Sequence, residues 1–300
     1  MNLSKTKINA LLALALFTFA FLAAEFRFDI NIGLLAGAER VVLARGFILG
    51  ASVLGFIGYA PLLGLAQRKG HSLAAVNAAA VPIVIPGLTQ IQFPTGPLTL
   101  EILGRIAFFG LGLLGAATHH AFSLAFQDGP KLATGAGAAY AAGIVFDLAE
   151  RRYMGLVMLG IAVLSTSSIL AVEAGADPNL GLVVFYLSSG FFVTFFTATF
   201  TQLAPRMHAP ALWAGMGRAA NNVCAFTTSG VSLALVTSGN VALIMIGALV
   251  LLVAACAAFV AAGLFRLPQT EQEREHQQLA EEALAAPSIE EQRQAFITDR

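Results

Sequence analysis

The side chains of this sequence that could bind or react with a ligand lie mostly inside apolar segments. Arg218, Asn221 and Asn222 stand at positions i, i+3 and i+4, so they share one face of a helix. That face could hydrogen-bond an anionic or polar ligand in a central cavity. Because Gly215 and Gly217 lie nearby, it equally fits a close helix-helix contact in which asparagine amides bridge neighbouring helices. Both interpretations stay open.

Two adjacent histidines, His119 and His120, lie deep in another apolar segment. Consecutive helical residues point about 100° apart, so at most one of the two can face a cavity. A proton-transfer or substrate-binding role for one histidine competes with plain hydrogen bonding inside a bundle. No cysteine or carboxylate stands at ligand spacing, so neither a metal nor another cofactor is expected. Glu101 and Arg105, at i and i+4, predict an interfacial ion pair.

The segment 143–152 ends one apolar stretch and leads directly into the next, which predicts a tight, charged turn at a membrane surface. The turn contains Gly143, the acidic residue Asp147 and the basic residues Arg151 and Arg152. Their charges could pair with neighbouring helices and hold one conformation closed, which makes the four residues gating candidates. The alternative is that the two arginines only anchor the turn on the cytoplasmic side.

The composition is that of an integral membrane protein. Of the 300 residues, 57% are hydrophobic and only 11% are charged, which is too few charges for the surface of a soluble domain. Phosphate-binding glycine loops, nucleophile motifs and metal-ligand spacings do not occur in a suitable setting. We therefore do not expect an enzyme.

Nine apolar stretches have the length, about 20 residues, that a helix needs to cross the hydrocarbon core. They lie near residues 8–24, 41–64, 72–93, 103–126, 131–149, 152–173, 180–203, 211–237 and 241–265. Short segments rich in glycine, proline, aspartate and asparagine separate many of them. The sequence thus predicts an all-α, polytopic transmembrane bundle of about nine spans.

The distribution of lysine and arginine predicts the orientation, because these residues stay on the cytoplasmic side of short loops. They recur at Arg151 and Arg152, at Arg206 and at Arg266, each time two spans further on, whereas the loops 174–179 and 238–240 have none. From residue 131 onward we therefore expect a multi-pass protein of the plasma membrane, the inner membrane of a bacterial cell, with a cytoplasmic C-terminus.

Upstream of residue 131, the number of spans conflicts with the rule that lysine and arginine stay on the cytoplasmic side. Counting back from a cytoplasmic Arg151 places Arg68 and Lys69 outside, together with Lys5 and Lys7, although all four should lie inside. Either an upstream stretch does not cross, or an N-terminal part is missing and the short basic loops are exceptions to the rule. The stretch 72–93 is the first suspect, because Pro82 and Pro86 interrupt it and could make it kinked or re-entrant.

The charged turn at 143–152 resembles the short cytoplasmic signature loop of major facilitator superfamily transporters. In this alignment four spans follow the turn, as they follow the loop between the eighth and ninth helices of a twelve-helix facilitator. The resemblance implies that 98–267 is a C-terminal six-helix bundle and that 1–97 holds about three spans similar to the fourth to sixth helices. The chain would then lack the first three helices. Leu148, Ala149 and Glu150 depart from the family loop.

The last segment, 268–300, carries eight acidic and three basic side chains and is expected to be a cytoplasmic helical tail. Ser288 and Glu291 form a capping box for an amphipathic helix. This helix resembles the linker that precedes the DNA-binding helix-turn-helix in membrane-bound LuxR-type regulators, and 212–222 is similar to a helix of their sensor bundle. The resemblance implies a DNA-binding output domain beyond Arg300. The alternative is an ordinary solvated extension.

Three functions follow from these observations. The first is a small-molecule sensing module, embedded in the lipid bilayer, of a LuxR-type transcriptional regulator. The alternative is a secondary transporter that moves a small solute by alternating access, and a scaffold without a ligand is the third. Direct binding of nucleic acid by this chain is not expected, because its tail is acidic and lacks a basic face.

Overall fold

The computed structural model describes residues 4–71, 73–126 and 154–262, and within these ranges every regular element is a helix. The elements are α1 (Lys5–Ala36), α2 (Ala38–Arg68), α3 (Leu73–Gln92), α4 (Pro97–Ala125), α7 (Met154–Glu173), α8 (Pro178–Leu203), η2 (Ala204–Arg206), α9 (Pro210–Thr237) and α10 (Val241–Ala261). Eight of the nine predicted stretches coincide with these α-helices. The ninth, 131–149, and the tail 268–300 lie outside the described residues.

Several helix boundaries follow from turn chemistry that the sequence displays. Asp177 accepts a hydrogen bond from the backbone amide two residues on, at 2.9 Å, and Pro178 occupies the first position of α8. Asn240 caps α10 in a similar way, at 3.1 Å. Gly175 and Gly239 adopt φ values of 99° and 61°, which residues with a Cβ rarely adopt. These turns are tight, so the helices that they join run antiparallel.

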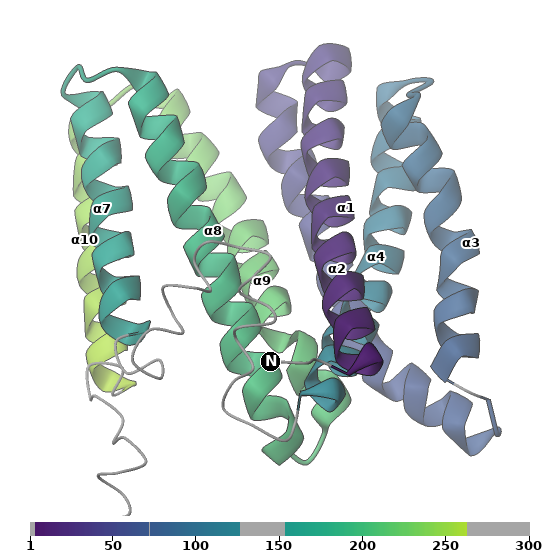
Figure 1. Ribbon diagram of the computed structural model, residues 1–300. Coiled ribbons are helices and arrows are strands. Elements are labelled where there is room, and N and C mark those ends of the chain that lie inside the picture. Colours follow the sequence, from purple (N-terminus) through teal and green to yellow (C-terminus); the bar gives the residue numbers. More distant parts are fainter. Residues whose placement is uncertain (1–3, 72, 127–153, 263–300) are drawn as a thin grey trace, which may run out of the picture.

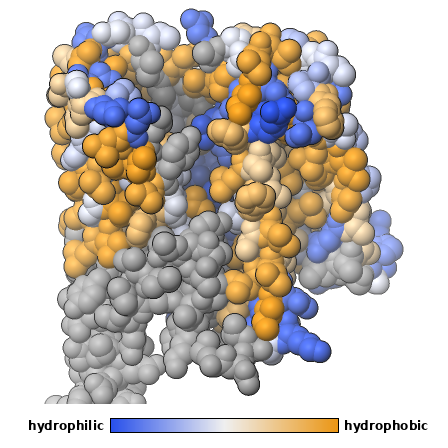
Figure 2. All heavy atoms as spheres, turned by 45° about the horizontal axis from the view of Figure 1, so that its top comes forward, coloured by the Kyte–Doolittle hydropathy of each residue, from blue (hydrophilic) through white to orange (hydrophobic). Residues whose placement is uncertain are grey.

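Six of the helices are long and apolar enough to cross a membrane: α1, α2, α4, α7, α8 and α10. Much of their apolar surface faces outward, and α10 buries none of its residues in the structure. Figure 2 shows this apolar exterior in orange. A helix with an apolar outer surface is stable in lipid, not in water. The protein is therefore a multi-pass membrane protein with at least these six candidate spans, and the count of nine stays a prediction.

The helices form two groups of four, α1–α4 and α7–α10, that stand side by side (Figure 1). Helix α4 packs against α1, α2 and α3, and the groups meet mainly where α9 packs against α2 and α4. The core of the first group is aromatic. Phe108 lies between Phe21 and Phe28, with ring centroids 5.1 and 6.4 Å away.

Glycines bring α2 and α4 into very close contact. A Cβ added to Gly55 would overlap the backbone of Phe109, and one added to Gly112 would overlap the carbonyl group of Ser52. Such close backbone approach is the usual role of small residues between membrane helices. We call this contact, together with the Arg40–Glu101 ion pair described below, the α2–α4 seam.

Of the described lysines and arginines at the helix termini, all but Arg40, near the start of α2, gather at one end of the molecule, which we call the basic end. In Figure 1, α1 begins at this end and α2 ends there, as do α4, α8 and α10, whereas α7 begins there. Lys5, Arg68, Lys69 and Arg206 therefore lie at the same end. The span count placed Arg68 and Lys69 opposite Arg206, in conflict with the distribution of charge, whereas in the structure α4 ends and α7 begins at one end of the bundle and these residues share that end.

A re-entrant segment at 72–93 does not have to be assumed to explain the positions of Arg68 and Lys69. Helix α3 is continuous from Leu73 to Gln92 and holds Pro82 and Pro86 within it. It runs from the basic end to the opposite end beside α4 (Figure 1).

Candidate functional site

A cavity of about 380 Å³ lies between the two groups of helices. Its walls come from α1 and α2 on one side and from α7, α8 and α9 on the other. Its polar lining consists of Glu25, Arg45, Ser165, Ser188, Ser189, Arg218, Asn221 and Asn222. Figure 2, which brings the end opposite the basic end forward, shows hydrophilic surface in a recess between two apolar masses. A polar cavity surrounded by apolar helices is the usual architecture of a solute site in a membrane protein.

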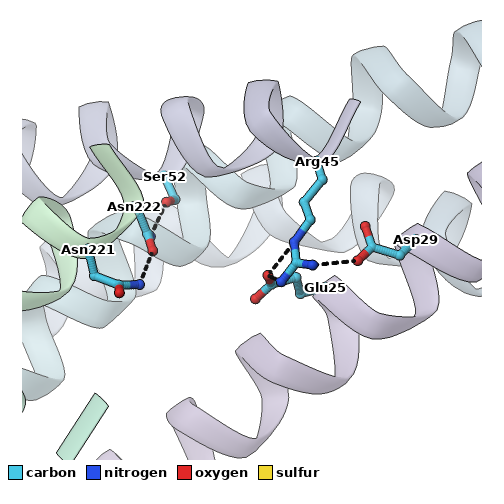
Figure 3. Close-up of polar contacts among 6 residues, drawn as sticks. All are labelled: Glu25, Asp29, Arg45, Ser52, Asn221 and Asn222. Atoms are coloured by element: carbon cyan, nitrogen blue, oxygen red, sulfur yellow. Dashed lines mark hydrogen bonds and ion pairs between the residues drawn. The ribbon is translucent and has the colours of Figure 1, made fainter. Parts of the chain in front are cut away.

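Glu25, Asp29 and Arg45 form a charged cluster at this cavity (Figure 3). Both Nε and a terminal nitrogen of Arg45 donate to the same oxygen of Glu25, at 3.0 and 2.6 Å. A nitrogen of Arg45 lies 3.6 Å from Asp29. Glu25 and Asp29 stand one helical turn apart on α1, so two carboxylates share one arginine.

Burial makes this cluster costly unless its charges are compensated. Glu25 is 7% exposed, whereas the side chain of Arg45 is 49% exposed. Oδ1 of Asp29 is buried and accepts no hydrogen bond from the described residues. Charges within a membrane span are expensive and mark functional sites by default. The cluster thus combines a buried carboxylate with an arginine that solvent or a ligand can reach.

Arg218 adds a second cation to the cavity from α9. The residue is 7% exposed, and its guanidinium carbon lies 4.9 Å from the centroid of the Phe21 ring, a cation-π contact. The lining residues include two arginines and one glutamate, and Asp29, which lies 3.6 Å from Arg45, brings the formal charge of the cavity and its charged cluster to zero. The cavity offers an anionic ligand two guanidinium groups, one from each group of helices.

The spacing of Asn221 and Asn222 left two interpretations open, a polar face toward a cavity and a helix-helix contact. In the structure each asparagine matches one of them. Asn222 is 1% exposed and donates to the Ser52 hydroxyl at 2.7 Å, so it bridges α9 to α2. Asn221 is half-buried, lines the cavity and donates to the Asn222 side-chain oxygen at 3.3 Å (Figure 3). One asparagine thus holds the groups together, and its neighbour presents an amide to the cavity.

The two histidines do not join this site. His119 is 3% exposed, one ring nitrogen lies 2.7 Å from the Gly115 carbonyl oxygen, and the rings of Phe17 and Phe56 pack against it edge-on. The ring of His120 lies 6.1 Å from that of Tyr59, centroid to centroid. Neither histidine lines the central cavity. The packing of His119 matches the alternative of a histidine hydrogen-bonded within the bundle.

The predicted ion pair between Glu101 and Arg105 is confirmed, with a nitrogen-oxygen distance of 3.0 Å. Arg40 of α2 also binds Glu101 through two hydrogen bonds of 2.7 and 2.8 Å. This second partner was not predicted. The gating candidates Gly143, Asp147, Arg151 and Arg152 lie outside the described residues.

Sequence reasoning missed the cluster of Glu25, Asp29 and Arg45. A signal was present, because two carboxylates at i and i+4 interrupt the long apolar helix that begins at Lys5. A carboxylate pair inside a membrane helix requires a cation from a neighbouring helix. Arg40 and Arg45, both early in the next helix, were the candidates.

Comparison of the chain with protein-family models, with curated proteins and with solved structures found no match.

Proposed function

We propose that this protein is a facilitator-like membrane protein that binds a small anionic solute in the central cavity and moves it across the membrane by alternating access. The cavity between the two groups of helices, with Arg45 on one side and Arg218 on the other, carries the proposal. Guanidinium groups are the preferred partners of carboxylates and phosphates, which they bind through paired hydrogen bonds. The amide of Asn221 adds a neutral donor for the same ligand.

The placement of the cavity supports movement of the solute as well as binding. A ligand that bridges Arg45 and Arg218 contacts both groups and therefore couples its own binding to their relative position. At the basic end the groups are joined by a hydrogen bond of 2.9 Å from the Ser123 hydroxyl to the Thr201 carbonyl oxygen. Figure 1 shows α8 closer to α1 near this end than at the opposite end. This arrangement is that of a bundle closed at the basic end.

The basic end is the cytoplasmic side in this proposal. Lys5, Lys7, Arg68, Lys69 and Arg206 lie there, and the short turns at the other end, near Gly175 and Gly239, have no lysine or arginine. Arg40, just after the turn at Gly37, is the exception at that end, and it is paired with Glu101. The state described here would then accept its solute from outside the cell. A cytoplasmic C-terminus follows from the same assignment.

A sensing module is the second candidate, favoured by the resemblance of 288–300 to the linker of LuxR-type regulators. It uses the same anion site, but the bound ligand changes the position of the tail instead of crossing the membrane. Uptake by the protein in sealed vesicles distinguishes the candidates. A transporter accumulates or exchanges the anion that it binds, whereas a sensor binds it without flux.

The test of anion binding is a thermal-unfolding screen of the purified full-length protein. The probes are acetate, succinate, inorganic phosphate and, as uncharged controls, acetamide and succinamide. We expect at least one anion, and no amide, to raise the unfolding midpoint, and we expect Arg218→Gln to abolish that rise. Arg206→Gln, at the basic end and away from the cavity, is the matched control. Equal stabilisation by acids and amides, or an undiminished rise in both Arg218→Gln and Asn221→Ala, would overturn the proposal.

A further inference from the structure

A second crevice, separate from the central cavity, lies between α2 and α3 at the basic end and has a volume of about 470 Å³. Most of its wall is apolar and includes Leu62, Leu65, Ala66, Ala79 and Ile83. None of its lining residues contributes to the central cavity. The proposed solute site therefore does not account for it.

A proline in α2 creates this crevice. Pro61 lies inside the helix, where it removes a backbone hydrogen bond and forces a bend. Figure 1 shows the last turns of α2 leaning away from the bundle before the chain returns as α3. Helix α3 stays packed against α4, so a wedge opens between α3 and the leaning end of α2.

The end of α2 places two polar side chains at the mouth of the wedge. Gly70 adopts a φ of 75°, and the His71 amide donates to the Ala66 carbonyl oxygen at 2.9 Å, which closes the helix in a compact C-terminal turn. Lys69 and His71, on either side of Gly70, both line the crevice. Arg68 is exposed beside them. The crevice thus has an apolar interior and a cationic mouth.

The outer surface around the crevice is apolar. Leu62 and Leu65, which line the crevice, are 43% and 52% exposed. In a membrane protein these side chains face hydrocarbon, so hydrocarbon is what enters an opening between them. A cationic mouth at the end of a hydrocarbon-filled wedge complements the phosphate of an anionic lipid.

We infer that the α2–α3 crevice is a binding site for an anionic phospholipid, with an acyl chain in the apolar wedge and the phosphate at Lys69 and His71. Each lysine or arginine near an anionic headgroup strengthens association by about 1 kcal/mol, or about fivefold. Arg68 and Lys69 together therefore predict a preference of about 25-fold for an anionic over a zwitterionic lipid of the same chain length.

Native mass spectrometry of the full-length protein tests the site, with titrations of phosphatidylglycerol and phosphatidylcholine that carry identical chains. We expect Lys69→Gln to reduce the preference for phosphatidylglycerol about fivefold. Lys5→Gln, at the same end but outside the crevice, is expected to leave it unchanged. Ala79→Phe fills the wedge without changing charge and is expected to weaken binding of both lipids.

Equal affinities of the unmodified protein for the two lipids would overturn the inference. An effect of Lys5→Gln as large as that of Lys69→Gln would also contradict it, because the preference would then belong to the whole basic end. Unchanged lipid affinity in Ala79→Phe would show that no chain occupies the wedge.

Discussion

Two charged clusters in this protein use the same residue types in opposite proportions. At the α2–α4 seam two arginines, Arg40 and Arg105, share the carboxylate of Glu101, and both carboxylate oxygens accept hydrogen bonds. At the central cavity two carboxylates share Arg45, and both hydrogen bonds of Arg45 to Glu25 go to one oxygen. In the first cluster both oxygens of the carboxylate are engaged. The second cluster lies at a cavity, and Oδ1 of Asp29 there accepts no hydrogen bond from the described residues.

The difference shows that helix α2 has two faces with different tasks. The face toward α4 combines the saturated Arg40–Glu101 pair with backbone contact at Gly55 and Gly112, so it resists movement. The face toward α9 carries Arg45 and Ser52, which contact their partners through a few directional hydrogen bonds. Such contacts can be exchanged for contacts to a ligand. We therefore expect substitutions at the seam to lower stability and substitutions at the cavity to lower ligand binding.

The largest loss of stability is expected from Glu101→Ala. The substitution removes a buried carboxylate that accepts three charge-assisted hydrogen bonds from Arg40 and Arg105, so we expect its loss to exceed that of any single contact below. Chemical unfolding in mild detergent measures this loss. Glu25→Ala, which leaves Asp29 as a second carboxylate beside Arg45, is expected to cost less than half as much. Equal losses would contradict the distinction between the clusters.

A smaller loss is expected from Gly112→Ala in the same seam. Its new Cβ would overlap the Ser52 carbonyl group, so α2 and α4 must separate, at a cost of about 2 kcal/mol. Gly58→Ala is the control on α2, because an added Cβ there meets nothing within 4 Å. The two thermal midpoints are compared under identical conditions. A midpoint for Gly112→Ala that equals that of Gly58→Ala would show that the seam is not close-packed.

Asn222→Ala is expected to cost about 1 kcal/mol, because it removes one buried hydrogen bond to Ser52. The matched substitution is Asn221→Ala, which is expected to change the unfolding free energy by less than 0.5 kcal/mol, as is usual away from buried networks. For anion affinity we expect the reverse order, so that Asn221→Ala lowers the affinity more than Asn222→Ala does. If Asn221→Ala lowers stability more than Asn222→Ala does, the assignment of the bridge to Asn222 is wrong.

Much of the fold could be predicted from the sequence, because an apolar run of about 20 residues has few options other than a membrane helix. Local spacing also predicted the ion pair of Glu101 with Arg105, which lie four residues apart. Their partner Arg40 lies 61 residues from Glu101 in the chain, and no local pattern connects the two. Ser52 and Asn222 are 170 residues apart and meet only through helix packing.

The candidate site was predicted in part. The shared face of Arg218, Asn221 and Asn222 follows from helical periodicity, and these residues line the cavity. Periodicity could not say which asparagine would bridge to α2, because that depends on how α9 is rotated in the bundle. The span count upstream of Arg151 conflicted with the distribution of lysine and arginine, because a parity count carries one error through every upstream span.

Protection of a cavity cysteine by the anion tests the central claim most directly. Ser189 lines the cavity and is exposed, so Ser189→Cys in a Cys224→Ser, Cys256→Ser background places a thiol there. We expect a small water-soluble thiol reagent, added from the side opposite the basic end, to label it. The anion that stabilises the protein in the thermal screen should slow that labelling, and it should lose this effect in Arg218→Gln. Labelling that the anion does not slow would contradict a solute site between the two groups of helices.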